Sequence, residues 1–264
     1  MTRRLRALIR KELRALFQSP IAYVVLTAFL VLNGVYFFQN LIEYNRELFV
    51  YGVQRFGGSI ETGTIPLSVN VLEHVFLPMA SDMSLILLAL VPLLTMRVFA
   101  EERAQGTDEL LLTTPLRPWE IAAAKHLASY GFVLLMLAAS AIYPAVAISK
   151  ENLGVGQLVA LYLGQLGYGL ALAAIGLACS ALSRSQIVAA VLAYAIPFVF
   201  YDFGWIEPVI SESVAALLGE AELRAHFERF SRGVVEFRHG IYFLGIMLLG
   251  YTVSVASLDL GRAR

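Results

Sequence analysis

The residues best placed to do acid–base chemistry are His74 and Asp82, which stand eight positions apart. That separation is about two turns of a helix, so the two side chains could share one face and act as a general base and a general acid. An intramembrane hydrolase or lipid transferase would need a nucleophile as well. The patterns G-x-S-x-G, H-E-x-x-H and G-x-x-x-x-G-K-[ST] do not occur in the chain, so the sequence offers no nucleophile set and no phosphate loop for hydrolysing ATP.

The four histidines and the single cysteine do not form a metal-binding pattern. His74, His126, His226 and His239 lie far apart in the sequence, and histidines at the borders of apolar segments are usually interfacial side chains. Cys179 alone can form neither an intramolecular disulfide nor a cysteine-rich metal site. We therefore predict no catalytic, cofactor-binding or metal-ligating residue in this chain.

The composition is typical of an integral membrane protein, whose surface largely faces lipid. Hydrophobic residues make up 58% of the chain, charged residues make up 15%, and the mean hydropathy is +0.71. Twenty basic residues balance twenty acidic ones, so no excess of positive charge points to nucleic acid, and none is predicted as a partner.

Charge-poor runs long enough to cross a bilayer recur along the chain. About 20 helical residues at 1.5 Å each cross a hydrocarbon core of about 30 Å. The second run is the weakest because Asp82 and Arg97 bracket it closely, so either its end charges snorkel to the interface or its helix begins earlier, near His74. We predict an all-α polytopic membrane protein that forms one domain over residues 1–264, with six transmembrane helices at 21–41, 82–98, 120–149, 157–183, 186–203 and 240–258.

The distribution of lysine and arginine favours one orientation. With the N-terminus in the cytoplasm, 13 of the 20 basic residues lie on the cytoplasmic side, against seven for the opposite orientation. Both termini would then be cytoplasmic in a multi-pass protein of the inner membrane, with 42–81 and 202–239 outside. Residues 1–18 alternate apolar and basic positions at helical spacing, which predicts an N-terminal helix lying in the cytoplasmic interface.

The segment 99–118, which we call the cytoplasmic segment, is polar, helix-prone and punctuated by proline. Thr107 can cap a short helix whose first turn holds Asp108 and Glu109, matching the positive end of the helix dipole. Three leucines follow, and Pro115 ends the element. An apolar patch rimmed by charges suits insertion into a cleft of another protein, although a plain connector lying on the bilayer has the same pattern.

A family resemblance rests on this segment. Residues 99–113, FAEERAQGTDELLLT, together with Pro115 and Lys125, resemble the cytoplasmic segment of ABC-2 type permeases, in particular the gliding-motility-associated branch. Residues 180–189, SALSRSQIVA, resemble the family's motif between its fourth and fifth spans. Ser185 stands where the family usually has asparagine, so no special role is assigned to it.

The resemblance implies a six-span permease half that pairs with a second permease chain, identical or related, and exports a substrate. A separate ABC ATPase subunit, present in two copies, would hold ATP and Mg²⁺ and drive the export. The cytoplasmic segment would be the coupling helix, with charged residues in charge-assisted contact with the ATPase and leucines in apolar contact. The residues assigned to this coupling are Glu101, Glu102, Arg103, Gly106, Thr107, Glu109, Leu110, Leu111 and Leu112.

Two other classes of function stay open at this point. One is a non-transporting membrane scaffold or assembly factor, and the other is the intramembrane enzyme built on His74 and Asp82. Few polar side chains lie in the predicted spans, which argues against an ion-coupled transporter and favours an apolar or lipid-like cargo.

Overall fold

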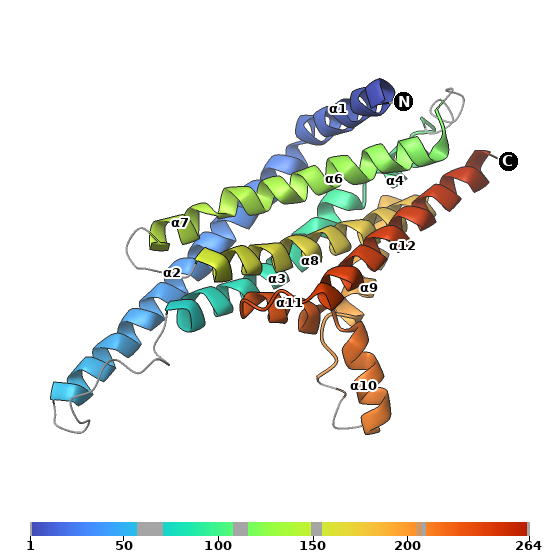
Figure 1. Ribbon diagram of the computed structural model, residues 1–264. Coiled ribbons are helices and arrows are strands. Elements are labelled where there is room, and N and C mark those ends of the chain that lie inside the picture. Colours follow the sequence, from blue (N-terminus) through green and yellow to red (C-terminus); the bar gives the residue numbers. More distant parts are fainter. Residues whose placement is uncertain are drawn as a thin grey trace.

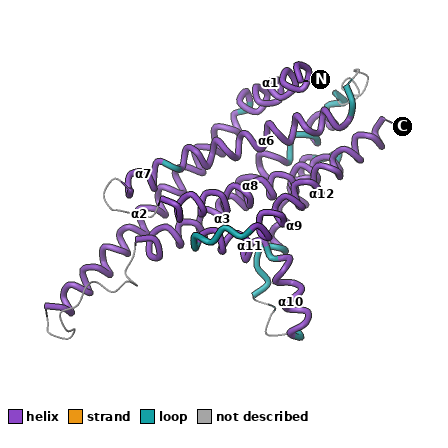
Figure 2. Tube along the Cα trace, viewed as in Figure 1, coloured by secondary structure: helices purple, strands orange, loops and turns teal. Residues whose placement is uncertain are grey.

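The computed structural model describes residues 2–56, 71–107, 116–148, 155–204, 206 and 210–262. Every regular element in these ranges is helical (Figure 2). The helices are α1 (Thr2–Gln18), α2 (Pro20–Phe56), the π-helical η1 (Leu72–Phe76), α3 (Leu77–Thr95), α4 (Ala100–Ala104), α6 (Pro118–Ser140), α7 (Ile142–Ile148), α8 (Val155–Leu182), α9 (Gln186–Val199), α10 (Glu212–Ala221), α11 (Leu223–Ser231) and α12 (Phe237–Arg262).

The prediction of an all-α chain with several membrane-spanning helices is confirmed. Five helical stretches are long and apolar enough to cross a bilayer: Pro20–Val53, Leu72–Ala104, Pro118–Val146, Val155–Leu182 and Phe237–Arg262. The sixth predicted span, 186–203, is the shorter helix α9. Fourteen residues at 1.5 Å each extend about 21 Å, less than the hydrocarbon thickness, so a sixth crossing stays a prediction.

The helices differ from the predicted boundaries at identifiable points. α2 continues past residue 41 to Phe56, because the charged residues that end its apolar run do not break the helix. The second span reaches back to Leu72 through η1, in agreement with the earlier start near His74. The predicted span 120–149 is divided between α6 and α7 at Ala141, ahead of Pro144, whose ring cannot continue the regular hydrogen-bonding pattern. The segment 202–239 contains α10 and α11, which are separated at Glu222, whose backbone is extended, and it also contains the first residues of α12.

The N- and C-terminal helices end on the same side as α4 (Figure 1). α3 leads directly into α4, and the last turn of α8 contacts the start of α4. α11 packs on α8 at the other end, where the side chain of Phe230 lies against Gly164. The bundle therefore has an α4 end and an α11 end.

α8 is the central helix of the bundle, and glycines allow its neighbours to approach closely. A side chain on Gly167 would meet Phe243 of α12, and one on Gly169 would meet Val133 of α6. Gly250 of α12 faces the backbone of α8, where a Cβ atom would lie 2.6 Å from the carbonyl oxygen of Ala174. The small residues of these helices thus serve packing within the chain.

Gly250→Ala should separate α12 from α8, because the backbone of Ala174 cannot move aside as a flexible side chain could. Overpacking of this kind costs about 1–3 kcal/mol. We expect a lower apparent melting temperature in detergent, measured by the monodisperse fraction that survives heating. Gly245→Ala is the matched control, since a Cβ atom there meets nothing within 4 Å. Equal melting temperatures for the two variants would contradict this packing.

Candidate functional site

α4 is attached to α8 through one serine hydroxyl. Ser180 Oγ accepts hydrogen bonds from the backbone N–H groups of Phe99 and Ala100, both at 3.0 Å, and donates one to the carbonyl of Met96 at 2.8 Å. The first N–H groups of a helix have no partner within the helix, so a side chain from another element has to satisfy them. Ser180 therefore fixes the start of α4 on the last turn of α8.

Arg103 joins the same helix to α12. Its guanidinium donates to the carbonyl of Ala181 and, at 2.9 Å, to Ser257 Oγ. Ser257 Oγ in turn donates to the Ala181 carbonyl at 2.6 Å. The three residues form a closed hydrogen-bonded set that holds α4, α8 and α12 together.

Lys125 of α6 is the buried cation of this junction, with only 2% of its surface exposed. Its ammonium lies 2.9 Å from Glu102 Oε1 and 3.2 Å from Glu12 Oε2, and it donates to the carbonyl of Val98 at 2.9 Å. Glu12 belongs to α1 and is itself buried. A buried ammonium is stable only when it is paired and hydrogen-bonded, so α1, α4 and α6 are bound together through this one charge.

A second ion pair runs along the turn between α3 and α4. The Arg97 guanidinium donates two hydrogen bonds to the Glu101 carboxylate, from Nη2 to Oε1 at 2.9 Å and from Nε to Oε2 at 3.1 Å. Its remaining nitrogen donates to Ser19 Oγ at 3.3 Å, at the junction of α1 and α2. Bidentate geometry makes this pair more directional than a simple surface contact.

Three of the predicted coupling residues are therefore bonded inside the chain. The side chains of Glu101, Glu102 and Arg103 contact Arg97, Lys125 and Ser257 respectively. The sequence alone suggested contacts with a partner protein for these three. We call the set that they form with their partners the α4 junction: Glu12, Ser19, Arg97, Glu101, Glu102, Arg103, Lys125, Ser180 and Ser257.

Gly106 terminates α4, which ends at Ala104. Its φ of +68° lies in the left-handed region, which a residue without Cβ adopts at no steric cost. The N–H of Gly106 bonds to the Arg103 carbonyl at 3.2 Å and the N–H of Thr107 bonds to the Glu102 carbonyl at 2.9 Å, the pattern of a Schellman motif. The predicted helix from Asp108 with Glu109 and Leu110 to Leu112 lies outside the described residues.

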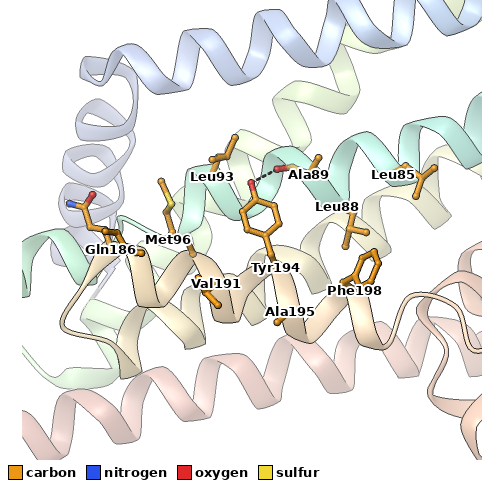
Figure 3. Close-up of a pocket in the computed structure, with 12 residues that line it drawn as sticks. Leu85, Leu88, Ala89, Leu93, Met96, Gln186, Val191, Tyr194, Ala195 and Phe198 are labelled. Atoms are coloured by element: carbon orange, nitrogen blue, oxygen red, sulfur yellow. Dashed lines mark hydrogen bonds between the residues drawn. The ribbon is translucent and has the colours of Figure 1, made fainter.

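An apolar groove opens beside the junction, between α3 and α9 (Figure 3). It has a volume of about 870 Å³, and its walls are apolar apart from the amide of Gln186 and the hydroxyl of Tyr194. The Tyr194 hydroxyl is not free, because it donates to the Ala89 carbonyl at 2.7 Å. Gln186 and Met96 line the groove at the α4 end, and Leu85 and Phe198 line it at the other.

His74 and Asp82 do not form the acid–base pair that their spacing suggests. His74 Nδ1 lies 2.8 Å from Glu47 Oε2, whereas Asp82 Oδ2 accepts a bond from Asn40 at 3.5 Å, and both partners belong to α2. Both side chains therefore face α2, but each is bonded to its own partner there and not to the other. Within the part of the chain that the structure describes, no group of three His, Cys, Asp or Glu residues could hold a metal ion.

Comparison with known families gives one match. The family model described as ABC-2 family transporter protein matches residues 59–213, a stretch that contains α3, α4, α6, α8, α9 and the groove. No curated protein matches the chain.

Proposed function

Since the family model covers more than half of its 264 residues, the chain belongs to the ABC-2 transporter family, and from this premise we propose that it is the permease subunit of an ABC exporter. The chain is a multi-pass membrane protein of a family whose membrane component is normally non-catalytic. A separate ATPase subunit would bind ATP and Mg²⁺ and supply the energy.

The α4 junction is the observation that carries the proposal. α4 is too short to be a stable element alone, yet side chains from α6, α8 and α12 are bonded to it or to the turn before it, and Glu12 of α1 is bonded to the same Lys125 of α6. A force applied to the cytoplasmic segment next to it would reach four helices at once. An element of this kind suits a two-state change driven by nucleotide binding on a partner.

We divide the predicted coupling residues into two groups. Glu101, Glu102 and Arg103 would transmit movement, since their side chains are bonded within the junction. Gly106 and Thr107 would set the direction in which the chain leaves α4. Docking to the ATPase is assigned to the remaining residues of the set, Glu109, Leu110, Leu111 and Leu112.

The proposed topology has six crossings and both termini in the cytoplasm. Its support is that α1, α4 and the end of α12 lie at one end of the bundle, which favours an even number of passes (Figure 1). α9 would supply the short sixth crossing. The excess of basic residues at the α4 end favours the cytoplasm for that end and the inner membrane for the protein.

The assembly would contain two copies of the ATPase and a second permease chain, identical or related. The face of α9 outside the groove is apolar and exposed, with Val188 and Val199 more than half exposed. The apolar groove favours a cargo with an apolar body. Membership of the gliding-motility-associated branch and the outward direction of transport rest on the resemblance of residues 99–113.

Purification of the tagged chain from its native membranes in mild detergent tests the proposal. We expect mass spectrometry to identify an ATPase with a phosphate loop in the purified complex. We also expect hydrogen exchange in the cytoplasmic segment to change when ATP is added. A chain that carries no ATPase and does not respond to ATP would favour the scaffold or assembly-factor alternative.

A further inference from the structure

Two histidines face each other at the α11 end of the bundle. His226 lies on α11 and His239 lies on the first turn of α12, and both are buried, with 4% and 8% of their surfaces exposed. Their Nδ1 atoms are 2.6 Å apart. The positions of the protons in this pair follow from what the other two ring nitrogens contact.

Each outer nitrogen faces a group that can only accept a hydrogen bond. His226 Nε2 lies 3.0 Å from the carbonyl oxygen of Glu220, so it carries a proton. His239 Nε2 lies 3.2 Å from the carboxylate of Glu236, so it carries one as well. Both Nδ1 atoms would then present lone pairs to each other, and a contact at 2.6 Å is attractive only if one proton is shared between them.

A shared metal ion does not fit this distance. Zinc binds imidazole nitrogen at about 2.0–2.1 Å, which in a tetrahedral site places two nitrogens roughly 3.3 Å apart. No third ligand joins the two histidines among the described residues. The pair therefore holds one proton at its centre and one net positive charge, which Glu236 balances.

The surroundings keep a second proton out at neutral pH. The ring of Tyr242 stacks on His226 at 3.7 Å, and its hydroxyl donates to the Ala221 carbonyl at 2.7 Å. Burial, the main cause, lowers the pKa of His226 below its usual range, and the charges of His239 and Arg238 lower it further. The hydrogen bond to the Glu220 carbonyl and, to a smaller extent, the Glu220 carboxylate act in the opposite direction, and this carboxylate is itself bonded to Arg238.

Other elements that pack near α11 bring charged groups that already have partners. α8 carries no charged side chain. Asp82 of α3 accepts a hydrogen bond from Asn40. Asp202, after α9, is paired with Arg224 of α11 at 2.6 Å. Apart from Glu236, the carboxylates in the described contacts are already bonded to other groups and do not stabilise a doubly protonated pair.

We propose that His226 and His239 form a proton-operated latch, which holds α11 against α12 while the pair shares one proton and releases α11 when a second proton binds. A second proton would place an N–H on both Nδ1 atoms and two positive charges in a buried site, so the contact would break. The closed pair binds one proton, whereas the two histidines of the open state bind two at low pH and none at high pH. Closure is therefore strongest near the ordinary histidine value of about 6.5 and weakens as the pH falls below that value.

Release of α11 would uncover the end of α8 that is remote from α4. α11 packs there on Gly164 and helps to enclose a polar pocket of about 560 Å³, lined in part by Gln157, Glu228 and Arg232. Acidification on this side of the membrane would therefore open the α11 end of the bundle. The latch depends on no partner protein and does not rest on the proposed function.

Hydrogen exchange of the full-length chain in nanodiscs, without any ATPase, tests the latch. The comparison is between about pH 5 and about pH 6.5, the ordinary histidine value at which the shared proton is held most tightly, after correction for the intrinsic effect of pH on exchange. We expect α11 peptides to exchange roughly fivefold to tenfold faster at the lower pH, while α3 peptides change little. Equal α11 exchange at the two pH values would overturn the latch.

His239→Gln should abolish the pH response, because an amide can donate to His226 Nδ1 but cannot accept a second proton. His226→Gln is the second variant if the first does not fold. His126→Gln is the control, a buried histidine of α6 near the α4 end, and should keep the response. A response that persists in His239→Gln and His226→Gln, or protection of α11 by added Zn²⁺ at neutral pH, would refute the shared proton.

Discussion

Lys125→Met should be among the most destabilising single substitutions in this protein, lowering the free energy of unfolding by about 3–5 kcal/mol. The substitution keeps the length of the side chain and removes the cation. Glu12 and Glu102, whose carboxylates lie 3.2 and 2.9 Å from the Lys125 ammonium, then lose their positively charged partner. Breaking a buried ion pair by removing one partner leaves uncompensated charge, which costs far more than the pair contributes. We expect the apparent melting temperature in detergent to fall by on the order of 10 °C.

The matched control for Lys125→Met removes the two carboxylates as well. In the triple variant Glu12→Gln, Glu102→Gln, Lys125→Met no charge remains in this part of the junction, so most of the lost stability should return. If Lys125→Met alone has the same apparent melting temperature as the native chain, the ammonium does not hold α1, α4 and α6 together. If the triple variant is as unstable as the single one, the loss comes from packing and not from charge.

The helical class and the approximate positions of the spans could be predicted because they depend on local composition. The long apolar runs and the segment rich in charge between them are visible in the sequence without any contact information. The end of α2 could not be located, because leaving the membrane ends an apolar run but not a helix. The π-helical turn at Leu72–Phe76 and the break at Glu222 likewise have no clear signal in hydropathy.

The candidate site could be predicted only in the part that is contiguous in sequence. Residues 99–113 and Lys125 are close enough to be considered together, and Lys125 does bind Glu102. Glu12, Ser180 and Ser257 come from three other helices, and only the fold brings them to α4. One signal was available: Glu12 is the single acidic residue in the strongly basic first helix.

The two histidines of the latch illustrate the same limit. His226 and His239 are thirteen residues apart, with a turn at Gly233 between them that reverses the chain. Residues thirteen positions apart are not neighbours on one face of a single helix, so the sequence suggested only separate interfacial side chains. Their contact depends on the angle at which α11 meets α12, which is a tertiary property.

Leu111→Arg should remove the ATPase from the purified complex while leaving the bundle intact. Leu111 lies outside the described residues, and its role as the centre of the docking patch is part of the proposed function. A buried charge at the centre of an interface typically costs at least about 2 kcal/mol, so recovery of the ATPase should fall by more than about tenfold. Recovery is measured as the ratio of ATPase to permease in the affinity-purified sample.

Leu260→Arg is the control for Leu111→Arg, because Leu260 is an exposed leucine of α12 near the same end of the bundle. It should keep the ATPase, and both variants should keep the native melting temperature. Lys125→Met loses stability through the junction, whereas Leu111→Arg would lose only the partner, so the two substitutions separate transmission from docking. Native recovery of the ATPase by Leu111→Arg would place docking elsewhere, and equal loss in Leu260→Arg would show that any added charge at this end displaces the partner.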